Sequence, residues 1–154
     1  MSSPPTLAEL TYEQAQKALE QQERQVNELR QRMGTLLGAA ALTASFFGTA
    51  ALGRAGASVP VILAGIALAV TVLGGLYVLY PHELDFASDA RRLYDALKPD
   101  RDDAERIYLR LAFGLRDTRT RNGARVEWLA RAFATALIAL AVQIACWTWA
   151  LTLL

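Results

Sequence analysis

The sequence has one cysteine and one histidine among its 154 residues, Cys146 and His82. A single cysteine excludes an internal disulfide, and with it the disulfide framework of small secreted domains. A zinc site needs three or four ligands, several of them usually histidine or cysteine, and this pair does not supply them. Glu83, Asp85 and Asp89 follow His82 closely, but an apolar stretch ends there, and we interpret the cluster as an exit from a membrane.

The chain also lacks the signatures of common catalytic machinery. It contains no phosphate-binding glycine loop and no serine, histidine and aspartate set. We therefore assign no catalytic residue, metal site or cofactor, and expect a protein that is not an enzyme. Its 16 basic and 15 acidic residues nearly cancel, so charge does not indicate a nucleic-acid partner. The polar start of the chain lacks the layout of a signal peptide, and we expect it to be retained.

Long stretches without charge dominate the rest of the sequence. They cover residues 33–52, 58–80 and 132–154, with 20, 23 and 23 residues. A bilayer core about 30 Å thick needs roughly 20 helical residues at about 1.5 Å each. A buried helix of a soluble bundle is usually shorter and rarely free of charge on every face. The sequence therefore predicts an all-α integral membrane protein with three transmembrane helices.

Basic residues predict the orientation of these spans. Four precede the first span, one lies in the loop 53–57, and eleven lie in the segment 81–131. The excess of basic residues on the cytoplasmic side places the N-terminus and segment 81–131 in the cytoplasm and the C-terminus outside. Trp128 would mark the inner interface of this plasma or inner membrane, and Trp147 and Trp149 the outer one.

Two of the spans continue into polar arms with helical periodicity. Apolar residues recur every three or four positions before the first span, which predicts one helix over 6–52 with a coiled-coil-like seam. The same spacing predicts a second helix, from about Asp100 into the third span. We expect these arms to pack antiparallel and a short helix, Ser88–Lys98, to cover them as a stalk. The predicted segments are a cytoplasmic helix (1–32), a transmembrane hairpin (33–80), a cytoplasmic helical segment (81–131) and the third transmembrane helix (132–154).

Small and polar side chains in the spans are candidates for contacts between helices. Gly34, Gly38, Ala44 and Gly48 belong to small-residue ridges on the first span, and such ridges allow close helix packing. Gln143 is the only strongly polar side chain well inside a span. Its amide needs a partner in lipid, so we expect it to face another helix.

Asn122 and Gly123 allow two interpretations. The pair is typical of a turn. Alternatively, it lies inside the long helix, with Asn122 on the seam, where a buried asparagine would fix register or oligomeric state.

A basic cluster lies just before the third span. We interpret it as a belt for anionic lipid head groups, and a pocket for a phosphate-bearing ligand is the alternative. The belt consists of Arg116, Arg119, Arg121, Arg125 and Arg131.

A family resemblance accompanies this layout. The chain has an amphipathic helix, then RMGTLLGAAALTASFFG, a second span ending in VLYPHELDF, SDARRLYDAL, and a helix leading into WLARAFATALIALAV. It resembles small bacterial, especially actinobacterial, membrane proteins related to the SLATT and Pycsar-type transmembrane modules. The resemblance implies a role in antiphage defence, in which such modules oligomerise and disturb the membrane. The SLATT pattern has two spans, whereas this chain has three.

Two functions follow from these observations. The first is a non-enzymatic, homo-oligomeric membrane effector, pore-type or membrane-perturbing, which is controlled through its cytoplasmic helices. The second is a passive membrane adaptor that docks a cytoplasmic partner protein on its stalk. Both involve the lipid bilayer, and neither involves nucleic acid.

Overall fold

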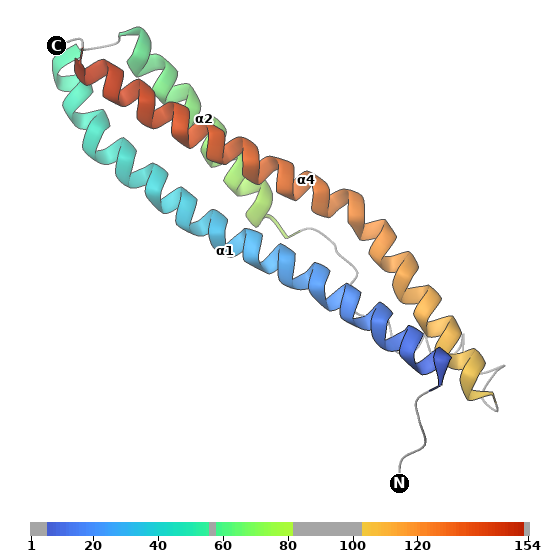
Figure 1. Ribbon diagram of the computed structural model, residues 1–154. Helices are drawn as coiled ribbons and strands as arrows, with labels where there is room; N and C mark the ends of the chain where they lie inside the picture. Colours follow the sequence, from blue (N-terminus) through green and yellow to red (C-terminus); the bar gives the residue numbers. More distant parts are fainter. Residues whose placement is uncertain (1–5, 56–57, 82–102, 153–154) are drawn as a thin grey trace. The chain divides into compact units, whose positions relative to one another are not determined.

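The computed structural model describes residues 6–55, 58–81 and 103–152. These residues form three helices and no strand: α1 (Leu7–Ala55), α2 (Val59–Leu79) and α4 (Ala104–Thr152) (Figure 1). Each contains a stretch long and apolar enough to cross a membrane, which confirms the prediction of an all-α chain with three such helices. The predicted helix Ser88–Lys98, the His82 cluster and Asp100 lie outside the described residues.

Local hydrogen bonds explain where the two long helices begin. At the start of α1 the backbone N–H of Thr6 donates to Glu9 Oε2 (2.9 Å), and the N–H of Glu9 donates to Thr6 Oγ1 (3.3 Å). This reciprocal arrangement is a capping box, which satisfies two backbone donors that the first turn leaves free. Before α4, Asp103 Oδ1 accepts from the N–H of Arg106 (3.2 Å), as an N-cap does.

Asn122 and Gly123 lie inside α4, which continues unbroken from Ala104 to Thr152. Asn122 is buried, and Gly123 is half-buried. Of the two interpretations of this dipeptide, the structure therefore shows the continuous helix. Periodic packing on both sides of the pair outweighs its local preference for a turn.

Contacts divide the chain into two units. The polar unit contains residues 1–26 and 82–126, described over 6–26 and 103–126. The apolar unit contains residues 27–81 and 127–154. Both α1 and α4 contribute to both units, whereas α2 belongs to the apolar unit alone.

In the polar unit, α1 and α4 run in the same direction. The rings of Tyr12 and Tyr108 lie with centroids 5.8 Å apart. Further along both helices, Gln22 Nε2 donates to the carbonyl of Arg119 (3.3 Å). Residues later in α1 therefore contact residues later in α4, which means that the two helices are parallel. The expected antiparallel packing of the arms is wrong. The physical reason is that α2 lies between α1 and α4 in the chain and runs opposite to both, so the first and third helices share one direction, and each arm continues its own helix.

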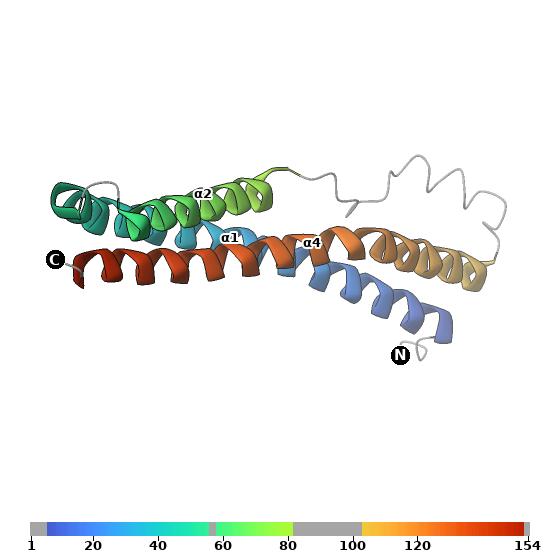
Figure 2. The same ribbon diagram turned by 90° about the horizontal axis from the view of Figure 1, so that it is seen from above.

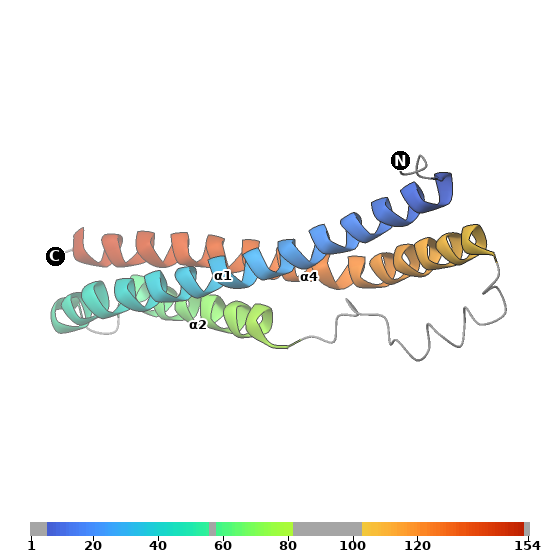
Figure 3. The same cartoon turned by 90° about the horizontal axis from the view of Figure 1, so that it is seen from below.

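In the apolar unit, α2 runs opposite to α1 and α4 (Figure 2 and Figure 3). Near one end of α2, Gly75 lies against Leu37 of α1, and Gly74 lies against Ala136 of α4. Near the other end a buried cluster joins all three helices. It consists of Ala51, Val61, Ala64, Cys146, Trp147 and Ala150.

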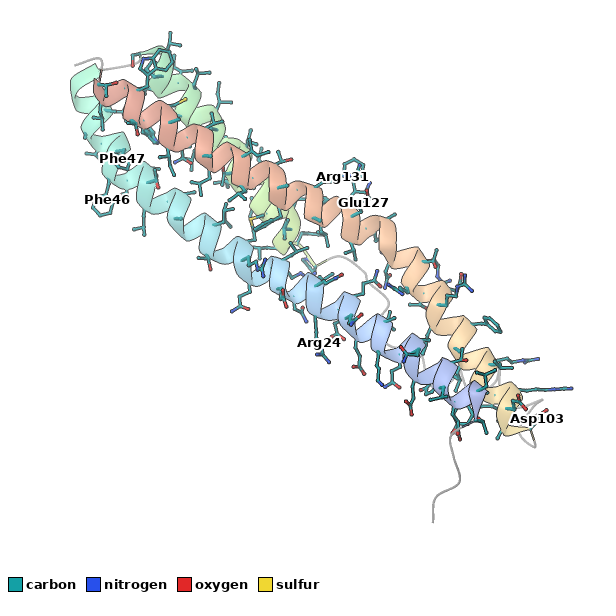
Figure 4. All side chains as sticks on the ribbon, viewed as in Figure 1. Arg24, Phe46, Phe47, Asp103, Glu127 and Arg131 are labelled. Carbon is teal, nitrogen blue, oxygen red and sulfur yellow. The ribbon has the colours of Figure 1, made fainter. Side chains whose placement is uncertain are left out.

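Most of the apolar surface of these helices faces outward. In their most apolar stretches, 22% of the residues of α1 and 33% of those of α2 and α4 are buried. Large side chains such as Phe46, Ile66 and Leu73 are mostly exposed, and Phe46 points away from the other helices (Figure 4). A helix inside a soluble core would be covered by protein, whereas lipid covers the outer faces of spanning helices. The exposure is therefore compatible with a multi-pass membrane protein.

Candidate functional site

Gln143 lies on the inner face of α4 in the apolar unit. Buried residues recur along this face at three- and four-residue steps, from Ala136 to Ala150, and Gln143 falls in the series. Its side chain is 0% exposed, and Nε2 donates to the backbone carbonyl of Ala40 on α1 (3.3 Å). An unpaired donor in hydrocarbon would cost several kcal/mol. The bond to Ala40 therefore couples α1 to α4 and satisfies a donor that is buried between the helices.

Trp147 lies one helical turn beyond Gln143, on the same face of α4. It is 5% exposed, and its ring atoms Cη2 and Cζ2 lie 3.5 Å from where a Cβ at Gly48 would stand. The Nε1 of Trp147 and the Oε1 of Gln143 are both buried without a protein hydrogen-bond partner. Sequence reasoning grouped Trp147 with Trp149 as an interface residue. The signal for its inward position was its four-residue spacing from Gln143.

The small residues of α1 point to two different sides. Gly48 is buried against Trp147, and Ala44 is half-buried. Gly34 and Gly38 are exposed, and a Cβ added at either would meet nothing within 4 Å. Gly48 thus packs against another helix of the same chain, while Gly34 and Gly38 leave the backbone of α1 exposed on the surface of the protein.

Threonine hydroxyls in the apolar unit also fall into two groups. Thr71 of α2 is fully buried, and its hydroxyl donates to the carbonyl of Ala67 (2.9 Å) and lies 3.4 Å from the carbonyl of Ala136 on α4. Other hydroxyls donate only to the carbonyl four residues earlier in their own helix, on the exposed side. Examples are the hydroxyls of Thr49, Thr135 and Thr148.

Polar side chains also interrupt the apolar seam of the polar unit. Gln22 of α1 and Asn122 of α4 are both buried. The amide of Gln22 reaches the Arg119 carbonyl, while its Oε1 is buried without a protein partner. A buried amide in a helical seam disfavours other alignments, because a shifted helix would leave more polar groups unpaired.

The structure distributes the arginine belt between the two units. Arg131 belongs to the apolar unit, where it pairs with Glu127 (Figure 4) and its guanidinium lies 5.3 Å from the centroid of the Trp128 ring. Arg121 belongs to the polar unit and pairs with Asp117 at 3.7 Å, on the exposed surface. Arg125 lies in the polar unit as well.

Arg116 and Arg119 of the belt line a cleft of about 260 Å³ in the polar unit. Phe113, which is 60% exposed, forms part of the same wall. Sequence reasoning missed this cleft, because it requires α1 and α4 to pack in a parallel register. The α1 side is lined by Thr11, Gln14, Ala15 and Ala18, and α4 adds Ala112.

Within the described ranges, no group of three His, Cys, Asp or Glu side chains could hold a metal ion. Cys146 is a free, buried thiol. The geometry of the described residues supplies hydrogen bonds and close packing between helices, together with a cleft that has both apolar and polar side chains in its lining. In comparisons with known proteins, no family model, curated protein or solved structure matches this chain.

Proposed function

We propose that this protein is a non-enzymatic, oligomeric membrane effector of the pore-type or membrane-perturbing kind, controlled through its polar unit. One observation carries the proposal: α1 and α4 each join a polar segment to a segment apolar enough to cross a membrane, without a break in the helix. A partner or signal that changes the packing of the polar segments would therefore act on the spans through continuous backbone. In this proposal the polar unit is cytoplasmic and the C-terminus lies outside.

The exposed glycines of α1 support self-association. Gly34 and Gly38 are spaced by one helical turn, and both have open space around them. Between helices in a membrane, association depends on close van der Waals packing, which such small residues allow. The resemblance to SLATT and Pycsar-type modules supports the same function. A second copy of the chain is thus the partner that we propose for this face.

Induced expression of the chain in bacteria is expected to collapse the membrane potential, measured with a potential-sensitive dye. Replacing both Gly34 and Gly38 by leucine is expected to reduce the depolarisation and the yield of cross-linked oligomer together. The leucine side chains would hold two helices apart at this face.

Gly65→Leu is the matched control. Gly65 is another exposed glycine in an apolar helix, and a Cβ there also meets nothing within 4 Å. It is expected to leave both measurements unchanged. Cells that keep their potential at high, membrane-inserted expression would argue against an effector that acts without a further partner.

The cleft of the polar unit favours a second candidate function, a passive adaptor. An exposed phenylalanine beside two arginines is suited to a protein segment that carries an apolar side chain and carboxylates. Under this function the polar unit would bind a cytoplasmic protein, and the membrane potential would not change.

A photo-cross-linking residue at Gln14, in the full-length chain in cells, is expected to capture such a partner. The adduct should disappear when Phe113→Ser and Arg116→Glu are introduced, because these changes remove the apolar contact and reverse the charge. The same cross-linker at Gln25, an exposed residue of α1 that does not line the cleft, is the control. An adduct that survives the cleft variant would contradict the adaptor function.

A further inference from the structure

We propose that Gln143 and Trp147 hold a water molecule inside the apolar unit. The amide oxygen of Gln143 and the indole N–H of Trp147 are an acceptor and a donor, and each is buried without a protein partner. Buried polar groups in proteins are nearly always paired, and ordered water commonly completes the pairing. Two unpaired groups of opposite kind on one helix face therefore indicate one shared partner.

The spacing of the two side chains fits a single water molecule. Residues four apart on a helix have Cβ atoms about 5–6 Å from each other, a separation that one bridging molecule spans. Both side chains are directed at α1, one at the carbonyl of Ala40 and the other at Gly48. Ala44 lies between these two positions on α1, where it is half-buried and carries only a methyl group. The water would accept from Nε1–H of Trp147 and donate to Oε1 of Gln143.

Other partners fit less well. Turning the Gln143 amide over would place its oxygen against the Ala40 carbonyl, two acceptors facing each other, so Oε1 must be the end that remains unpaired. A second copy of the chain does not reach these groups, because Gln143 is 0% and Trp147 5% exposed. An apolar cavity would stay dry, but this site offers both a donor and an acceptor.

Nuclear magnetic resonance of the full-length chain tests the proposal directly. In detergent micelles, with ¹⁵N in the tryptophan indoles, the indole proton of Trp147 is expected to give a cross-peak with water that arises from proximity rather than from exchange. Trp147→Phe identifies the signal by its loss. Trp128, which is exposed, should give a water cross-peak in every variant.

Two substitutions should remove the Trp147 cross-peak by different routes. Gln143→Met removes the acceptor at similar side-chain length, and Ala44→Leu fills the space while it leaves both polar groups in place. Circular dichroism shows whether each variant folds. If either does not, the presence or absence of the Trp147 water cross-peak in the unsubstituted chain still tests the proposal. A Trp147 indole proton shifted by hydrogen bonding but without a water cross-peak would show a direct bond to Gln143, and the proposal would be wrong. A cross-peak that persists unchanged in folded Gln143→Met would also overturn it.

Discussion

Replacing Trp147 by alanine is expected to lower the free energy of unfolding by about 3–5 kcal/mol, the range found when large aromatic side chains are removed from protein cores. Trp147 is the largest member of the buried cluster that joins the three helices, and its ring fills the space beside Gly48. In a membrane the hydrophobic effect contributes little between helices, so packing contacts of this kind carry much of the stability. The cost within this range depends on how far the neighbouring helices move into the space that the indole leaves.

Trp149→Ala is the matched control for this prediction. Trp149 is the same residue type, two positions along the same helix, and is 49% exposed. Its removal is expected to change the free energy of unfolding by less than about 1 kcal/mol, as is usual for surface substitutions. Unfolding in mixed micelles, followed by circular dichroism during addition of a denaturing detergent, measures both variants. Equal effects of the two substitutions would contradict the burial of Trp147.

Gly74→Leu is expected to destabilise the apolar unit by about 1–3 kcal/mol or more, through overpacking of the contact between α2 and α4. A Cβ at Gly74 would already lie 3.2 Å from the Cβ of Ala136 and 3.4 Å from the carbonyl oxygen of Ala132. The second neighbour is backbone, which does not rotate away as a flexible side chain would. The three further carbon atoms of leucine therefore have to push the helices apart.

Gly65→Leu in the same helix separates this steric effect from the intrinsic preference of leucine for helices. Around Gly65 there is open space, so the substitution adds helix propensity of up to about 1 kcal/mol without a clash. The same detergent titration is expected to show Gly65→Leu at or above the stability of the unsubstituted chain and Gly74→Leu well below it. Loss of stability in both variants would mean that glycine itself, rather than the space beside it, is required.

The helices were predictable because charge-free length and three- to four-residue periodicity are local properties of a sequence. Whether Asn122 and Gly123 form a turn or lie within a helix was not predictable, because the local preference of the pair favours a turn while the periodicity of the seam favours a helix. The common direction of the arms follows from the order of the helices, because α2 runs opposite to both α1 and α4, and the expectation of antiparallel packing neglected this reversal. The parallel register then determines which residues meet, as Tyr12 and Tyr108 show.

The residues around Gln143 illustrate the limit of sequence reasoning at the candidate site. A polar side chain within an apolar stretch is visible in sequence, so Gln143 was identified as one that needs a partner. Its partner is the carbonyl of Ala40, and a backbone atom has no sequence signature. Trp147 was assigned by composition to an interface, because hydropathy does not distinguish the faces of a helix.

The exposed threonines of the apolar helices have a consequence for the gene. Each hydroxyl of Thr49, Thr135 and Thr148 is already bonded within its own helix, so alanine at these positions would remove no contact between helices. Threonine and alanine codons differ by a single base, and these sites are free to drift between the two. Thr71 is constrained, because its hydroxyl is shared with a second helix. Neutral amino-acid substitutions should therefore accumulate on the outward faces of the apolar helices and be removed by selection at buried positions such as Thr71.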